Sequence, residues 1–235
     1  MIHTGVPSWV VWFVSLTIGP TTALLIVFLV WEKIRPRPAK RVVRGDTTIE
    51  LWVRERKYPS SAEAIVVPVA PDLKMTTGIA KWVRDRTANR LQRQAELAAP
   101  LEPGEVFVGS GGKFKFRLAA LAVVMDDAKR AQPEWITQSV KRAFLMAREH
   151  DARSIIVPDM TEDLLRQPTD ITDEQRRETC RPIAHAIVEA ILEAPDDMEE
   201  IKIWCWRKVN EDIYVQELER LEPYRPVSRA AATAH

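Results

Sequence analysis

The sequence is poor in the residues that build metal sites and catalytic nucleophiles. Its 235 residues include two cysteines and four histidines. Cys180 and Cys205 lie in separate predicted elements and the histidines are scattered, so their number and spacing do not fit a zinc site. Ser110 lies between glycines but lacks the histidine and acid that would activate it. We therefore predict no metal, no cofactor and no catalytic nucleophile.

Charged residues are absent from the start of the chain, where no Asp, Glu, Lys or Arg precedes Glu32. The stretch Trp9–Trp31 is long enough to cross about 30 Å of hydrocarbon as a helix. Tryptophans lie near its ends, as they do at membrane interfaces. A cleaved signal peptide would need a basic start and a small-residue cleavage site, and the sequence has neither. We predict a transmembrane helix over residues 9–31 after a short extracytoplasmic segment, residues 1–8.

A basic segment follows, which we predict to be a linker over residues 32–44. Its basic residues are Lys33, Arg35, Arg37, Lys40, Arg41 and Arg44. Positive charge next to a membrane span marks the cytoplasmic side, so we expect a single-pass protein of the cell membrane with its domain in the cytoplasm. The alternating prolines of Arg35-Pro36-Arg37-Pro38 predict an extended and stiff linker.

The charge of the remaining chain argues against nucleic acid as a partner. Of 34 basic and 33 acidic residues, six and one lie before Gly45, which leaves 28 and 32 and a net charge of −4. A mildly acidic domain binds phosphate backbones poorly. The expected partners are the membrane, through Trp9–Trp31, and a nucleotide-type small molecule or a protein. We predict that residues 223–235 form a disordered tail.

Strands and helices alternate between residues 45 and 222. Short apolar runs predict strands, and apolar residues at helical spacing predict helices between them. The predicted strands are 48–53, 64–69, 105–108, 117–125, 154–158 and 201–206, and the predicted helices are 78–97, 133–150, 172–194 and 210–221. Pro133 and the capping pattern Thr172–Gln175 mark the starts of the second and third helices, and Asn210 is the expected N-cap of the last. Pro182 predicts an interruption or restart in the third helix, and Asp159–Asp170 is predicted as an irregular loop. This order predicts one α/β domain, a three-layer α/β/α sandwich with a mixed, mostly parallel sheet.

The stretch Glu63–Val83 is the strongest candidate for a ligand site. A buried strand, Ala64–Val69, leads through a loop to Thr76-Thr77-Gly78 and then to a helix. Glycine allows a sharp turn or a close ligand approach, and the backbone N–H groups of a helix N-terminus attract phosphate. Gly78 could equally serve the turn alone.

The order of four motifs resembles the macro domain, a module that binds ADP-ribose. They are Gly45-Asp46-Thr47-Thr48, the strand and loop Ala64–Pro71, Thr76–Ala80, and Ser154–Pro158, and the resemblance runs from about Arg44 to about Leu221. It implies that Asp46 accepts a hydrogen bond from the adenine amino group. It also implies a first phosphate loop with Thr76, Thr77, Gly78 and Ile79 and a second one with Thr161 and Leu164. By composition alone, Asp46 could also be a solvated turn residue.

The departures from the family pattern concern the groups that define ligand and reaction. Prolines, Pro68 and Pro71, stand where the family has asparagines, one of which supports catalysis in its hydrolytic branch. The second phosphate loop carries three carboxylates, Asp159, Glu162 and Asp163, and no glycine. A carboxylate about 4 Å from a phosphate costs roughly 4 kcal/mol at a surface-like dielectric.

These departures predict a membrane-anchored domain that binds or senses an ADP-ribose-like or other nucleotide ligand without catalysis. Two alternatives stay open. One is a structural or protein-interaction module with a degenerate pocket, and the other is a divergent ADP-ribosyl hydrolase.

Overall fold

A computed structural model describes residues 37–53, 62–111, 116–165 and 171–221. The described helices and strands all lie within the compact unit Pro38–His235. The predicted extracytoplasmic segment 1–8, the transmembrane segment Trp9–Trp31, the start of the linker and the tail 223–235 lie outside the described residues. Within the described ranges, no helix has the length and apolar character needed to cross a membrane.

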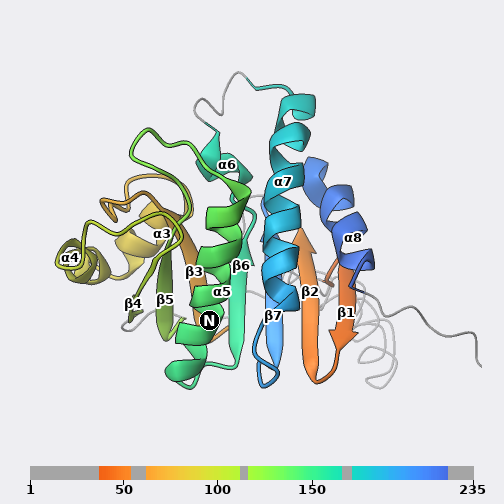
Figure 1. The fold of residues 1–235 in the computed structure, drawn as a ribbon, viewed down its shortest axis with the longest axis horizontal. Helices are drawn as coiled ribbons and strands as arrows, with labels where there is room; N and C mark the ends of the chain where they lie inside the picture. The colour runs from red at the N-terminus through yellow and green to blue at the C-terminus, as the bar shows by residue number, and fades with distance from the viewer. Residues whose placement is uncertain (1–36, 54–61, 112–115, 166–170, 222–235) are drawn as a thin grey trace, which may run out of the picture. The chain divides into compact units, whose positions relative to one another are not determined.

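The described strands form one seven-stranded sheet in the order β1-β2-β7-β6-β3-β5-β4 (Figure 1). Their bounds are β1 Lys40–Arg44, β2 Thr47–Val53, β3 Ala64–Val69, β4 Val106–Ser110, β5 Leu118–Val123, β6 Ser154–Pro158 and β7 Glu200–Cys205. The five central strands are parallel, and the edge strands β1 and β4 are antiparallel to their neighbours. The predicted mixed, mostly parallel sheet is confirmed.

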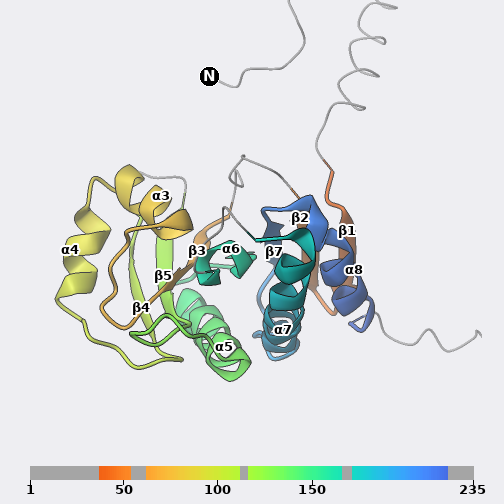
Figure 2. The same cartoon turned by 90° about the horizontal axis from the view of Figure 1, so that it is seen from above.

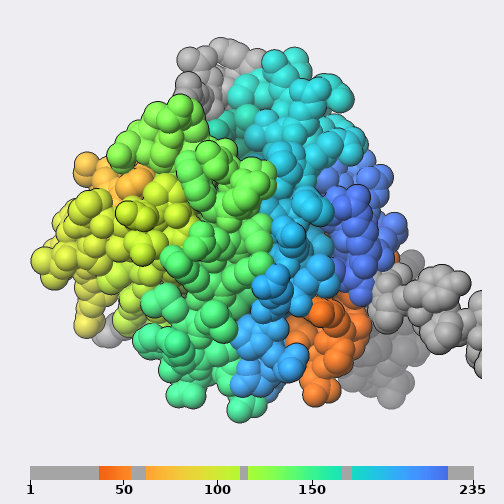
Figure 3. Space-filling view, viewed as in Figure 1, coloured from red at the N-terminus to blue at the C-terminus, as the bar shows by residue number. Residues whose placement is uncertain are grey.

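Helices cover both faces of the sheet, as the three-layer prediction requires (Figure 2). Helices α5, α7 and α8 pack on one face, which Figure 3 shows from outside, and α3 and α4 pack on the other. Their bounds are α3 Gly78–Arg86, α4 Arg90–Glu96, α5 Pro133–Glu149, α6 Thr161–Leu164, α7 Asp173–Leu192 and α8 Glu211–Glu219, with a 3₁₀ turn at Lys208–Asn210.

The strand β3 shows why the apolar run Ala64–Val69 folds as a central strand. All six of its residues are buried, because helices lie on both sides of it. Alternate side chains point to opposite faces, so Val66 packs with α5 and α7 while Ile65 and Val67 pack with α3. Two apolar cores result, one on each side of the sheet.

Pro68 changes the pairing of β3 within the sheet. The Leu118 N–H donates to the Glu63 carbonyl (3.0 Å) and the Val124 N–H donates to the Val69 carbonyl (3.2 Å). The backbone N–H and C=O groups of the odd-numbered residues of β3 therefore point toward β5. Pro68 therefore faces β6, and it has no N–H to donate. Residue pairing between β3 and β6 stops at Ile65 and Ile156. The carboxyl ends of β3 and β6 are consequently not joined by a ladder.

The predicted linker 32–44 is wrong in its second half, where β1 forms a hairpin with β2. The turn contains Gly45, whose φ of +57° suits glycine. Val42 is buried, and Arg44 donates to the Leu192 carbonyl (2.6 Å) at the end of α7. The basic residues suggested a linker, but charged side chains are also typical of an edge strand.

The predicted helix 78–97 is two helices, α3 and α4. Ala88 and Asn89 between them have φ angles of +49° and +60°. A left-handed pair ends one helix and re-aims the next. No glycine or proline lies at this break, so the sequence pattern did not predict it.

The later helices follow the prediction more closely. Pro133 lies at the start of α5, and Thr172 and Gln175 form the predicted capping box of α7. Helix α7 continues through Pro182, where an interruption or restart was predicted. The segment after β6 was predicted as an irregular loop, but it contains the one-turn helix α6.

Candidate functional site

A cleft of about 550 Å³ lies at the carboxyl ends of the parallel strands β3, β6 and β7. This is the edge at which open α/β sheets bind ligands. The cleft is lined by Thr77, Gly78, Ile79, Ala128, Lys129, Pro158, Asp159, Glu162, Asp163, Leu164, Leu165, Trp204, Trp206 and Arg207. Its size falls within the range of small-molecule sites.

One wall of the cleft is the N-terminus of α3. Thr77 is the N-cap residue, but its side chain makes no capping hydrogen bond, and the first turn of α3 contains no acidic residue. Gly78 has a φ of +52°, and Ile79 is buried behind it. The partial positive charge of this helix end is therefore not balanced by the helix's own side chains.

Asp163 of α6 reaches this helix end from across the cleft. A Cβ added to Gly78 would lie 1.8 Å from Asp163 Oδ1, so the carboxylate rests against the glycine backbone. The Ile79 N–H bonds to Asp163. Desolvation by burial raises the pKa of Asp163 to about 7, against the lowering effect of that hydrogen bond. Asp163 thus occupies the position at which the N–H groups of α3 would meet a phosphate.

Glu162, the next carboxylate, is neutralised by arginines. It forms an ion pair with Arg176 of α7, which is buried. Arg207, at the end of β7, places its Nε 3.5 Å from Glu162 Oε1. Glu162 therefore links α6 to α7 and β7, and its charge is largely compensated before any ligand arrives.

Asp159, the third carboxylate, is buried and turned into a polar cluster beneath the cleft. It accepts hydrogen bonds from Thr161 N (3.1 Å), Asn210 Nδ2 (2.9 Å) and the Tyr214 hydroxyl (3.3 Å), and the Cys205 thiol lies 3.6 Å away. Asn210 was predicted as the N-cap of α8, but its side chain makes no cap bond and serves Asp159 instead.

The buried cluster also governs the titration of its neighbours. Burial raises the pKa of the Tyr214 hydroxyl and of the Cys205 thiol, and the charge of Asp159 raises both further. These groups therefore stay protonated, and neither supplies a thiolate or phenolate nucleophile. The cluster fixes the turn between β6 and α6 in place.

Two tryptophans at the end of β7 also line the cleft, of which Trp206 is partly exposed, whereas Trp204 is buried and belongs to the same apolar core as Ile79 of α3. The rings of Trp204 and Trp206 lie 5.1 Å apart at 75°, an edge-to-face pair. Sequence analysis missed both, together with Arg207 and Lys129. The signal was present, because an aromatic and basic Trp204-Cys205-Trp206-Arg207 ends a strand predicted as parallel, and the carboxyl ends of parallel strands share one edge.

The structure brings together most of the predicted ligand residues. Thr77, Gly78, Ile79 and Leu164 all line the cleft. Thr76 adjoins Thr77 but is not a lining residue, and Thr161 is fully buried behind the wall, where it bonds to Asp159. The start of α3 and helix α6 thus both line the cleft, and they meet where Asp163 contacts Gly78.

Asp46 is the exception, and its placement in this site is wrong. It lies in the β1–β2 turn, before β2 begins, and lines a separate pocket with Arg44 and Asp196. Because β2 runs parallel to β7, the start of β2 lies at the amino-terminal ends of the parallel strands, opposite the cleft at their carboxyl ends (Figure 1). The sequence motif preceded the strand, whereas a cleft residue would have to follow it.

The two prolines also do not touch the cleft. Pro68 is buried within β3, and Pro71 lies in a loop that packs inward through Leu73 and Met75, both fully buried. The Gln92 side chain of α4 fixes this loop by accepting the Met75 N–H (2.8 Å). The prolines therefore shape the sheet and its loop and do not line the site.

The titratable groups of the cleft are carboxyl groups and basic side chains. Among the described residues that line it there is no histidine, cysteine, serine or asparagine, and the acids are Asp159, Glu162 and Asp163. In the part of the chain that the structure describes, no group of three or more His, Cys, Asp or Glu residues could hold a metal ion.

Solved structures of macrodomains share this fold. A mutant of the Oceanobacillus iheyensis macrodomain with ADPR is 16% identical, has a TM-score of 0.58, and covers 77% of this chain and 97% of its own. The same macrodomain with ADP is 18% identical, with a TM-score of 0.59 and coverages of 77% and 95%. The Trypanosoma brucei macrodomain in complex with ADP is 14% identical, with a TM-score of 0.56 and coverages of 72% and 68%. No curated protein gives a significant match.

A family model matches within the same region. Residues 66–175 match the macro domain model, and they contain most of β3 together with α3, β6 and α6, whereas β7, which also lines the cleft, lies outside the match. This match agrees with the fold of the described residues and with the resemblance found in the motifs. Residues 66–175 therefore resemble the macro domain family, and the described residues share the fold of solved macrodomains.

Proposed function

We propose that this chain is a membrane-anchored module that binds or senses an ADP-ribose-like or other nucleotide ligand without chemical turnover. The observation that carries the proposal is the cleft at the carboxyl ends of β3, β6 and β7, whose lining includes the N-terminus of α3 and the partly exposed Trp206. A partly exposed aromatic side chain such as Trp206 can stack with a base.

The relatives support the choice of ligand class. Macrodomains with this fold have been solved with ADPR and with ADP, at 14% to 18% identity. The edge of the sheet and the helix terminus are common to the fold, whereas this chain supplies its own lining residues. We expect the base and sugar of the ligand to lie between α3 and the partly exposed Trp206.

The absence of turnover is part of the proposal. A hydrolase needs a positioned base together with groups that stabilise the charge developing on the substrate. Of the carboxyl groups that line the cleft, Glu162 is paired with arginines, and Asp159 accepts hydrogen bonds from buried donors. Asp163 has a pKa near 7 but lies against the N-terminus of α3, which leaves it poorly placed to activate water.

A second candidate function is a structural or protein-interaction module. The specific observation in its favour is the contact between Asp163 and Gly78, which closes the helix N-terminus to a phosphate. In that case the fold would present surfaces to a protein partner and the cleft would stay empty of nucleotides. The membrane anchor of residues 9–31, with the domain on the cytoplasmic side, serves either function.

Calorimetry on the purified full chain distinguishes these functions. A panel of adenosine, AMP, ADP and ADP-ribose should give saturable heat for at least one compound. Heat for none of them would reject the binding proposal and favour the interaction module. Incubation with an ADP-ribosylated protein should release no ADP-ribose, and measurable release would overturn the non-catalytic part.

A further inference from the structure

Asp163 is the feature of the cleft that the proposed function leaves unexplained. Its carboxylate lies on the backbone of Gly78 and accepts the Ile79 N–H, the place that favours a ligand's phosphate. We propose that Asp163 determines ligand specificity, so that the cleft takes an uncharged nucleoside-type ligand and discriminates against its diphosphate. This inference rests on the proposed function, since it names the ligand class of the same site.

The contact is built by the fold and not by an exposed chain end. Helix α6 follows β6 directly, and Leu164 N and Leu165 N bond back to the carbonyls of Met160 and Thr161 (3.1 Å each). Asp159 fixes the start of α6 from beneath through Thr161, and Glu162 ties it to Arg176. Three consecutive anchors thus hold Asp163 against α3.

The other carboxylates do not share this role. Asp159 already accepts hydrogen bonds from Thr161, Asn210 and Tyr214, and Glu162 is paired with two arginines. Neither is therefore available to help Asp163 bind a cation. A single carboxylate at a helix N-terminus is a substitute for an anion, because it satisfies the same N–H groups and the same dipole.

The remaining lining is suited to an uncharged ring system. Ile79, Leu164, Leu165 and the pair Trp204–Trp206 give the cleft apolar walls. The Asp163 carboxylate can accept hydrogen bonds from ligand N–H and O–H groups, which a nucleoside supplies and a diphosphate does not. A diphosphate at α3 would have to displace the carboxylate or lie beside it, and either loses favourable electrostatics.

The cations near the cleft do not reverse this preference. Arg207 and Arg176 are both engaged with Glu162. Lys129 lines the cleft from the segment after β5, on an exposed stretch, so its charge is screened by solvent. The charged groups around Asp163 are thus Asp159 and Glu162 from its own segment, Lys129, Arg176 and Arg207.

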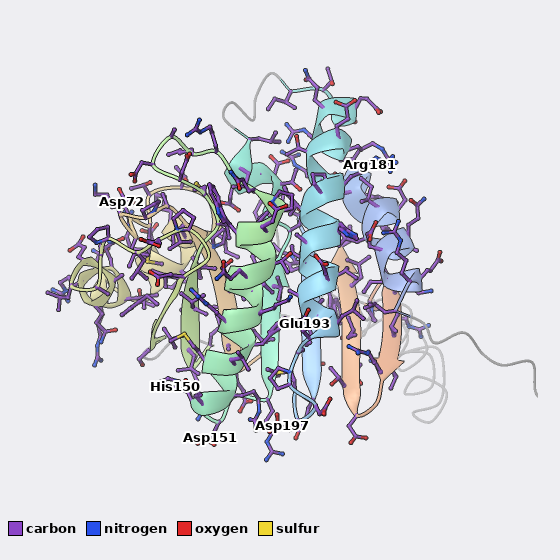
Figure 4. All side chains as sticks on the ribbon, in the orientation of Figure 1. Asp72, His150, Asp151, Arg181, Glu193 and Asp197 are labelled. Atoms are coloured by element: carbon purple, nitrogen blue, oxygen red, sulfur yellow. The ribbon has the colours of Figure 1, made fainter. Side chains whose placement is uncertain are left out.

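The test compares ligand preference in the wild-type chain and in Asp163→Asn, which keeps the side chain's shape and removes its charge. Calorimetry at pH 8 on the full chain measures the dissociation constants of adenosine and ADP-ribose. Wild type should prefer adenosine by about tenfold or more, and Asp163→Asn should shift the ratio toward ADP-ribose by about tenfold or more. Asp151→Asn removes the same charge at the lower end of the sheet (labelled in Figure 4) and should leave the ratio unchanged.

A second measurement needs no variant. The diphosphate of ADP-ribose keeps its charge between pH 6 and pH 8. Asp163, whose pKa is raised to about 7, becomes protonated as the pH falls from 8 to 6. Wild type should therefore bind ADP-ribose more tightly at pH 6 than at pH 8, and Asp163→Asn should lose most of this difference.

The outcomes separate this inference from the proposed function. If wild type and Asp163→Asn bind the two ligands with the same ratio, the inference is overturned while the binding function stands. If neither protein binds either ligand at either pH, the binding function is overturned, and the specificity inference falls with it.

Discussion

The three carboxyl groups that follow β6 show how far the surroundings of a residue decide its role. All three precede or lie within one short helix, yet Asp159 is buried among donors, Glu162 is paired with arginines, and Asp163 lies against Gly78. The sequence predicted only that three negative charges would crowd a phosphate site. Their directions follow from α7, β7 and α8, which approach from distant parts of the chain.

The first residue-scale prediction concerns Gly78. Gly78→Ala places a side chain at a φ of +52° and 1.8 Å from Asp163 Oδ1, so we expect a loss of about 2 kcal/mol in the free energy of unfolding. Gly45→Ala is a matched control, because Gly45 has a similar φ of +57° with nothing within 4 Å. It should cost about 1 kcal/mol, from backbone strain alone. Urea unfolding measures both.

The contact itself is tested by a double-mutant cycle. In an Asp163→Ala background, Gly78→Ala should cost no more than Gly45→Ala does, because the oxygen that opposes the new Cβ is gone. Strict additivity of the two substitutions would show that Asp163 does not rest on Gly78.

The second residue-scale prediction uses the titration of Asp163. Its pKa is raised from 3.8 to about 7 by desolvation, so the folded state holds a proton that the unfolded state releases between these values. The stability it contributes is complete below about pH 4 and is lost as pH rises toward 7. Relative to Asp163→Asn, wild type should therefore lose stability between pH 4.5 and 7.5. Urea unfolding at several pH values checks this, and parallel pH profiles would contradict it.

The third prediction concerns the buried cluster. Asp159→Asn leaves the donors Asn210 and Tyr214 facing a weaker acceptor and introduces an amide N–H among them, so we expect a loss of about 3 kcal/mol in unfolding free energy. Asp127→Asn, at an exposed position, should change stability by less than about 0.5 kcal/mol. Equal stabilities of the two variants would show that the cluster contributes nothing.

At the scale of elements, local patterns predicted most of the fold. The strands β3, β5 and β6 were found from apolar runs, and α5 and α7 from helical spacing with Pro133 and the Thr172 capping box. Each of these signals lies within the element it predicts. The misses were β1, whose basic residues suggested a linker, and the break between α3 and α4, which depends on left-handed Ala88 and Asn89.

The cleft was predictable in part for the same reason. Gly78 and its neighbours follow a buried strand and open a helix, which is a local pattern. Asp46 was misplaced because its motif is local, whereas its distance from the cleft depends on the parallel pairing of β2 with β7. Trp204 and Trp206 were missed because their position relative to α3 depends on strand order. Sequence spacing alone does not give that order.

The element-scale prediction tests the start of α7. Thr172 accepts the Gln175 N–H (3.3 Å), and Gln175 Oε1 accepts the Thr172 N–H (3.0 Å). Thr172→Ala should therefore cost about 1 kcal/mol of unfolding free energy. Thr179→Ala, inside the same helix, removes only a hydroxyl bonded to the Gln175 carbonyl and should be neutral or slightly stabilising. Equal effects of the two substitutions would contradict the capping role.

For the whole molecule, we propose a domain with the macro fold behind a membrane anchor. The domain spans the described residues from β1 to α8, with its cleft at the carboxyl edge of the sheet and the β1–β2 turn at the opposite edge. The anchor of residues 9–31 is proposed from composition, since those residues are not described. Fractionation of cells that express the full chain should place it with membranes, and a chain lacking residues 1–36 should leave them.

The central claim is that the cleft between α3 and the end of β7 holds a nucleotide-type ligand. The most direct measurement is the NMR signals of the tryptophan indole N–H groups in the full chain, assigned by single Trp→Phe substitutions, during titration with adenosine and ADP-ribose. The signals of Trp204 and Trp206, which line the cleft, should shift in a saturable manner, while that of Trp135 in α5 should not. Saturating shifts elsewhere, or no shift with either compound, would contradict the claim.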